Sequence, residues 1–150
     1  MPPMIRFHPL LILLLVATSD LPALSPRPAD PGPVALRFIN GHVAAVPGYE
    51  ETIARVQASE LVTERYQEAL TKLYRDALKQ DPEYGYGADA VIGGQDSPDR
   101  FRVKSSKVDG DRARVVLIGE DPQFPMEVNV DLVREDGRWL VDASGDLIRD

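Results

Sequence analysis

Apolar residues follow two different periods along the chain, and the period changes near residue 100. Before that point they recur every three or four positions, as on one face of an α-helix. After it they alternate with polar residues, as in a half-buried β-strand. The first period predicts three helices over residues 33–46, 50–56 and 59–79, with Ser59 as the cap of the third.

The same spacing predicts which helix faces are buried. On the first helix the apolar stripe consists of Ala35, Phe38, Ile39, His42, Val43 and Val46. On the third helix it consists of Val62, Tyr66, Leu73 and Ala77, widened by Leu70, Tyr74 and Leu78.

The alternating region predicts four strands over 101–108, 113–119, 126–135 and 139–144. A two-residue Asp136-Gly137 turn would place Asp131 opposite Asp142 in the last hairpin. One face of that hairpin is then apolar and the other polar, except for Val133 and Leu140 near its centre. The apolar face consists of Met126, Val128, Val130, Leu132, Trp139 and Val141.

Helices followed by an antiparallel run of strands predict an α+β fold, with N-terminal helices packed on a curved four-stranded antiparallel sheet. One sheet face would pack on the helices. The other would meet solvent or a second copy of the chain, which makes a homodimer through the sheet one expectation.

The N-terminal segment has a different composition from the rest, with eight of the 13 prolines in residues 1–33. Arg6, an apolar run over 10–17 and small residues ending at Ser19 have the layout of a signal peptide. Eight apolar residues rise only about 12 Å as a helix, too short to span a membrane. The sequence therefore predicts a signal peptide over 1–25, cleaved after Ser19 or Ser25, an extended Pro-rich tether over 26–33, and one domain over 34–150. Such a protein would be exported to the periplasm or cell exterior.

Charge and cysteine content exclude several classes of protein. The formal net charge of −7 disfavours nucleic-acid binding, because an acidic domain repels phosphate backbones. The absence of cysteine excludes disulfide scaffolds, thiol catalysis and thiolate metal sites. No cofactor and no metal site is expected.

Short motifs add a family resemblance over about residues 34–148. The segment Asp89-Ala90-Val91-Ile92-Gly93-Gly94-Gln95-Asp96, then Phe101-Arg102-Val103 and Gly137-Arg138-Trp139, resembles an uncharacterised exported bacterial branch of the nuclear-transport-factor-like, SnoaL-like superfamily. The resemblance implies a cone-shaped α+β domain of unknown function. That superfamily includes enzymes, transport adaptors and binding modules, so the resemblance implies no particular activity.

Three groups of residues are candidates for chemistry. His42, on an apolar helix stripe, is either a base facing a pocket, with Tyr66 or Tyr74 as partner, or a satisfied core histidine. Asp131 and Asp142, if directly opposed, would share a proton or a metal ion, unless a cation such as Arg114 neutralises them.

The third group lies in the long loop over 81–99, where Tyr86, Gln95 and Asp96 are candidate ligand-binding residues at a pocket mouth. Asp96 before Ser97-Pro98 is equally typical of a turn.

These observations favour an exported, non-enzymatic domain that binds a small apolar molecule or a partner protein, in a pocket between helices and sheet. Two alternatives stay open. One is a small lyase or isomerase that uses His42. The other is an envelope inhibitor or immunity-type protein, which would bind one partner tightly.

Overall fold

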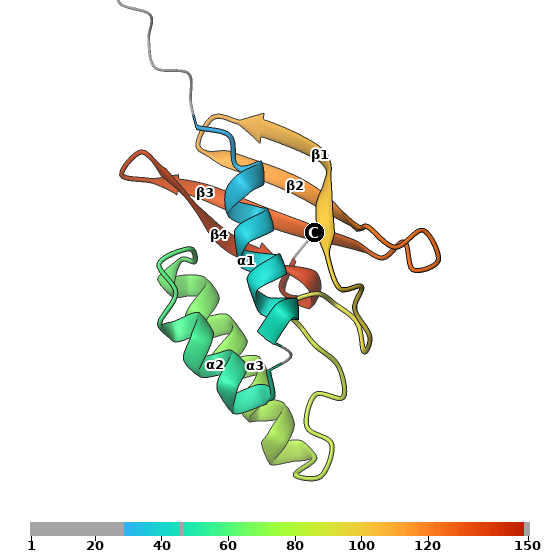
Figure 1. The fold of residues 1–150 in the computed structure, drawn as a ribbon. Helices are drawn as coiled ribbons and strands as arrows, with labels where there is room; N and C mark the ends of the chain where they lie inside the picture. Colours follow the sequence, from blue (N-terminus) through green and yellow to red (C-terminus); the bar gives the residue numbers. More distant parts are fainter. Residues whose placement is uncertain (1–28, 46, 149–150) are drawn as a thin grey trace, which may run out of the picture.

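The computed structural model describes residues 29–45 and 47–148, and contains three helices followed by a four-stranded antiparallel sheet (Figure 1). The helices are α1 (Gly32–Ala45), α2 (Tyr49–Gln57) and α3 (Glu64–Gln80). The strands are β1 (Phe101–Asp109), β2 (Arg112–Gly119), β3 (Glu127–Glu135) and β4 (Arg138–Ser144), and a short 3-10 turn, η1 (Gly145–Leu147), follows. The α+β fold is confirmed, and the sheet is not closed.

Helix α1 begins one residue earlier than predicted. Gly32, expected in the tether, is its first residue, its N–H donates to the Asp30 carboxylate at 2.9 Å, and Pro33, the predicted first residue, follows it. Proline is well suited to a first helical turn, where its missing N–H leaves no intrahelical bond unmade. Ahead of the helix, the Trp139 ring N–H donates to the Ala29 carbonyl at 2.5 Å. The predicted signal peptide and the first residues of the tether lie outside the described residues.

The third helix also starts at a different residue. Its N-cap is Thr63 and not Ser59, and the Thr63 hydroxyl accepts a hydrogen bond from the Tyr66 N–H. The preceding residues run along the edge of β4, since the Thr63 N–H donates to the Val141 carbonyl at 2.9 Å. Val62, predicted in the helix, is instead a bridge partner of Val141. Because residues 61–63 pair with the edge of β4, they stay extended and α3 begins only at Glu64.

The strands match the predicted ranges within one residue at each end. Burial alternates along β2, β3 and β4, as predicted, whereas in β1 only Phe101 is buried. Their order in the sheet is β1-β2-β3-β4, each antiparallel to its neighbour.

The register of the last hairpin corrects one prediction. The pairing from Glu135↔Arg138 to Leu132↔Val141 is as expected, but Asp131 lies opposite Ala143 and not opposite Asp142. A β-bulge at Asp142 adds one residue to β4. Val130 is consequently opposite Ser144, whose side chain is fully buried.

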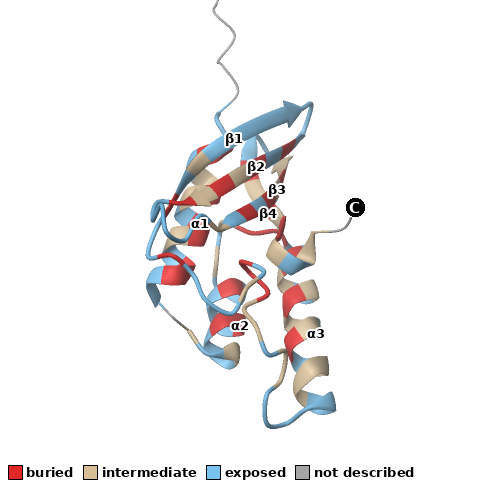
Figure 2. Cartoon of the chain, turned by 90° about the vertical axis from the view of Figure 1, so that its right-hand side faces the viewer, coloured by how far each residue is buried: buried red, intermediate tan, exposed pale blue. Residues whose placement is uncertain are grey.

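The core lies between the inner face of the sheet and the helices (Figure 2). Helix α1 packs across β1, β2 and β4, while α2 and α3 run side by side and α3 reaches β4 (Figure 1). Trp139 is buried, as predicted, and so is Phe101. On α3 the buried residues are Tyr66, Leu70 and Tyr74, whereas Leu73 and Ala77, predicted at the centre of the stripe, are only half-buried.

Among the described residues, no helix is both long and apolar enough to cross a membrane.

Candidate functional site

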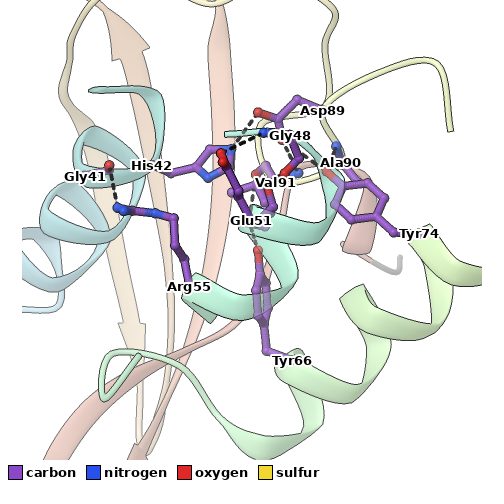
Figure 3. A network of polar contacts seen from close by, with 12 residues as sticks. Gly41, His42, Gly48, Glu51, Arg55, Tyr66, Tyr74, Asp89, Ala90 and Val91 are labelled. Atoms are coloured by element: carbon purple, nitrogen blue, oxygen red, sulfur yellow. Dashed lines mark hydrogen bonds and ion pairs between the residues drawn. The ribbon is translucent and has the colours of Figure 1, made fainter. Parts of the chain in front are cut away.

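His42 on α1 contacts the long loop through a carboxylate. Its side chain is only 5% exposed, and Nε2 lies 2.6 Å from an Asp89 carboxylate oxygen (Figure 3). The other carboxylate oxygen accepts from the Val91 N–H at 3.0 Å and from the Tyr74 hydroxyl at 3.4 Å. Asp89 therefore joins α1, α3 and the loop. Of the two tyrosines predicted as partners, Tyr74 belongs to this network through Asp89.

An open hollow of about 440 Å³ lies beside this network, which we call the His42 pocket. Helices α1, α2 and α3 contribute His42, Tyr49 and Tyr74 to its wall, and the loop contributes Asp89 and Gln95. None of the described residues that line it belongs to a strand. The pocket was predicted between helices and sheet. It lies among the helices and the loop instead, because side chains fill the space above the sheet.

Tyr66 is one of the side chains that fill the space between the helices and the sheet, and it is not a partner of His42. Its side chain is fully buried, and its hydroxyl lies 2.8 Å from the Ser144 hydroxyl, which in turn donates to the Val91 carbonyl at 2.7 Å. Burial raises the pKa of Tyr66 well above its usual range, so the phenol is neutral. This position makes Tyr66 a structural residue.

The three loop residues predicted as ligand-binding lie in three different places. Gln95 lines the His42 pocket and donates to the Gly87 carbonyl at 3.0 Å. The Tyr86 hydroxyl donates to Asp146 at 3.0 Å, beside α3. Asp96 lies in a separate hollow near the turn between β2 and β3. The centre of the loop, residues 90–92, is buried in the core.

Asp131 and Asp142 are each held by an arginine, on the outer face of the sheet. Arg114 on the neighbouring strand binds both carboxylate oxygens of Asp131, at 2.7 and 2.9 Å. Arg65, from the first turn of α3, binds Asp142 at 3.0 Å, and the Thr63 hydroxyl donates to the same carboxylate at 2.8 Å. The predicted neutralisation by a cation is therefore confirmed for Asp131 through Arg114, whereas Asp142 uses Arg65.

The charge state of Asp142 follows from these contacts. Burial alone would raise its pKa, but the hydrogen bonds from Arg65 and Thr63, together with the positive charges of Arg65 and Arg112, outweigh burial and hold the pKa below its ordinary value. An ionised, fully paired carboxylate does not share a proton with a second one. This geometry does not fit an acid–base pair at Asp131 and Asp142.

The same aspartates line a larger hollow of about 690 Å³, which we call the outer groove. Its wall crosses all four strands, with Lys107, Arg112, Arg114 and Asp131 among its side chains, and Arg65 and Leu147 close one end. A second hollow of about 440 Å³, the α3 trough, runs along Ala69, Leu73 and Ala77 and includes Tyr86. Arg65, Asp142 and Leu147 line both hollows, so the outer groove continues into the α3 trough.

Sequence reasoning missed Asp89, Arg65 and the two hollows on the outside of the molecule. The one available signal for Asp89 was its place at the head of the Asp89–Asp96 motif. Arg65 gave no signal, since it is one of several charged residues on a solvated helix face. Nowhere in the described part of the chain do three histidine or carboxylate side chains gather closely enough to hold a metal ion.

Comparison with known proteins gives little beyond this geometry. No family model matches the chain, and no curated protein matches it. Among solved structures, a chain in the crystal structure of the type VI native effector-immunity complex Tae3-Tai3 from Ralstonia pickettii matches with a TM-score of 0.48 and 22% sequence identity. The match covers 79% of this chain and 95% of that chain. At this similarity no residue role is carried over, and the resemblance to the nuclear-transport-factor-like superfamily stays a prediction.

Proposed function

We propose that this chain is a protein-binding domain of the inhibitor or immunity type, which acts by occupying one partner protein. The observation that carries the proposal is the continuity of the outer groove with the α3 trough through Arg65, Asp142 and Leu147. Together they form an open surface across the sheet and one helix, with apolar side chains at one end and charged side chains at the other.

Such a surface fits a protein better than a small molecule. Small-molecule sites are mostly enclosed and apolar, whereas protein interfaces combine apolar anchors with a polar, partly hydrated rim and take about 800 Å² from each partner. In the described part of the chain, the space above the sheet is filled by buried side chains such as Tyr66, Leu70 and Leu117, which leaves no such site there. The solved structure compared above is an effector-immunity complex, the kind of pairing proposed here, but the proposal rests on the surface of this chain.

Export is part of the same proposal. An inhibitor of a toxin that acts in the cell envelope has to be present there, and the predicted signal peptide would deliver it. The intact mass of the protein recovered from the envelope would then correspond to a chain beginning at Asp20 or Pro26.

The decisive experiment is isolation of the partner and measurement of its activity. The tagged protein, produced in its own organism, is recovered from the envelope fraction, and any protein retained through washing is identified by mass spectrometry. We expect the purified partner to form a complex of one copy of each chain by light scattering, and its activity to fall to zero at one equivalent. A partner that stays fully active when bound would contradict the inhibitor function.

A second candidate function, proton transfer on a small substrate, is favoured by one observation. His42 is oriented by Asp89 beside an open pocket, an arrangement in which a carboxylate fixes the imidazole of a general base. Native mass spectrometry of the exported protein distinguishes the candidates. A small mass retained in the native spectrum, lost on denaturation and lost in His42→Gln, would favour this second function.

A further inference from the structure

The surface just described specifies the chemistry of what binds it. We infer that the partner protein enters through one segment that carries both apolar side chains and a carboxylate. The apolar side chains pack into the α3 trough, and the carboxylate binds Arg112 and Lys107 in the outer groove. This inference rests on the proposed function and adds to it the part of the partner that is recognised.

The α3 trough calls for apolar contact because its charges are already paired. Ala69, Leu73 and Ala77 are spaced four residues apart on one face of α3, so they form a stripe about 12 Å long. Asp76 beside them forms ion pairs with Lys72 and with Lys79, and the Asp146 carboxylate accepts from Tyr86. Between these paired charges, the half-buried apolar stripe is open to solvent, with Leu147 at its end.

The outer groove favours an anion, because among its described side chains the charges without an ion pair are two cations, Lys107 and Arg112, and one carboxylate, Asp109. Arg65 and Arg114 are bound to Asp142 and Asp131. Within the part of the chain that the structure describes, neither Lys107 nor Arg112 forms an ion pair or a side-chain hydrogen bond.

Both of these side chains are exposed, and Arg112 lies near enough to Asp142 to lower its pKa. The Asp142 carboxylate is already held by Arg65 and Thr63, so Arg112 is available for an incoming group. A guanidinium binds a carboxylate through two parallel hydrogen bonds, which makes Arg112 the principal anchor and Lys107 its support.

One segment can make both contacts because the two hollows join at the Arg65–Asp142 pair. A second copy of this chain is a poorer occupant. Each copy carries a net charge of −7, so two copies repel one another before the local contacts form. A partner protein that is not strongly negative is not subject to this electrostatic repulsion.

Site-specific photocrosslinking tests the placement. A benzophenone amino acid replaces Leu73 in the trough or Lys107 in the groove of the full-length protein, and Arg75, exposed on α3 outside the trough, is the control position. We expect both test positions to crosslink to one protein, on neighbouring stretches of its sequence, with Asp, Glu or the C-terminal carboxylate beside the Lys107 crosslink. Crosslinks to a second copy of this chain, or to a segment without a carboxylate, overturn the inference.

Affinity measurements with the captured partner test the chemistry. Arg112→Glu and Lys107→Glu are exposed changes that leave the fold intact, and we expect each to weaken binding about 10-fold or more. Arg112→Lys should recover part of the loss, Leu73→Asp should also weaken binding, and Arg75→Ala should bind like the wild type. If the wild type binds its partner one to one and the groove and trough variants bind equally well, the inference fails and the proposed function stands. If the wild type binds no protein, both fail.

Discussion

Ser144 is buried at the end of β4, and its hydroxyl contacts two groups that have no other partner among the described hydrogen bonds. Its single hydrogen donates to the Val91 carbonyl, so the Tyr66 hydroxyl must donate to Ser144. Ser144→Ala leaves both groups unpaired in the core, whereas Tyr66→Phe removes one donor and leaves the Val91 bond in place. We expect Tyr66→Phe to cost about 1 kcal/mol and Ser144→Ala about 2–4 kcal/mol of unfolding free energy.

Urea denaturation of the two variants checks this order, with far-UV circular dichroism confirming that both fold. The prediction fails if Tyr66→Phe is the more destabilised of the two. If the unfolding free energy of Ser144→Ala lies within a few tenths of a kcal/mol of the wild-type value, the Val91 carbonyl and the Tyr66 hydroxyl have found other hydrogen-bond partners.

The same residues show how far side-chain chemistry could be predicted. The position of His42 on a buried helix face follows from spacing alone. Its partner Asp89 does not, because it is 47 residues away in a loop whose turn is set by tertiary packing. Tyr66 and Tyr74 are both buried on α3, and helix spacing does not reveal that Tyr66 contacts Ser144 whereas Tyr74 contacts Asp89, the partner of His42.

At the scale of elements, the bulge in β4 links the sheet to α3 and gives the fold a dependence on pH. Burial would raise the pKa of Asp142, but hydrogen bonds from Arg65 and Thr63 and the charges of Arg65 and Arg112 outweigh burial, so the folded-state pKa lies below its ordinary value of 3.8. Its stabilising contribution is therefore fully present above pH 3.8 and is lost as the pH falls through the lower, folded-state pKa. We expect Asp142→Asn to be less stable than the wild type at pH 7, and the difference to shrink in acid.

Unfolding free energies from urea titrations at neutral and acidic pH measure this convergence. Glu135→Gln, an exposed change at the far end of β3, is the control and should follow the wild type at both pH values. A difference between Asp142→Asn and wild type that stays constant with pH would contradict the assigned role of the carboxylate.

Helices and strands were predictable where the local spacing of apolar residues determines them and no long-range contact intervenes. The four strands follow from alternation, and α1 follows from its apolar stripe and the proline residues near its ends. The start of α3 was wrong because residues 61–63 pair with the β4 edge, a long-range contact that helix spacing cannot reveal. The bulge was missed because Val141 and Ala143 alternate with polar neighbours as in a regular strand.

At the scale of the whole molecule, the sequence predicted most of the residues that pack, but neither the filled space above the sheet nor the shape of the outer surface. The spacing of apolar residues identifies the face of a helix that can pack. It does not show how much of that face other elements cover, so Leu73 and Ala77 were assigned to the core. In the described part of the chain, α1 and α3 pack on one face of the sheet and α2 packs on α3, so part of the apolar surface of α3 and the outer face of the sheet stay open. This surplus of apolar surface on α3 is the feature of the complete fold from which the proposed interface follows.

The complete fold also depends on two tyrosines that connect α3 to β4 and to the long loop. Burial raises the pKa of Tyr66 above its ordinary value of 10.0. Burial, followed by the nearby Asp89 carboxylate, does the same for Tyr74. A raised folded-state pKa means that the stabilisation is fully present below pH 10.0 and is lost as the pH rises toward the folded-state value. Above pH 10.0 the unfolding free energy should therefore fall by about 1.4 kcal/mol per pH unit for Tyr66 alone.

Because both phenols are locked into the core, they should ionise only when the molecule unfolds as a whole. In an alkaline titration we expect part of the tyrosinate absorbance to appear in the same step in which far-UV circular dichroism is lost. Tyr66→Phe should make the fall of stability with pH shallower, even though it lowers stability at neutral pH. Ionisation of every tyrosine before any loss of secondary structure would mean that α3 separates from the sheet locally. The interface on α3 would then be mobile before binding.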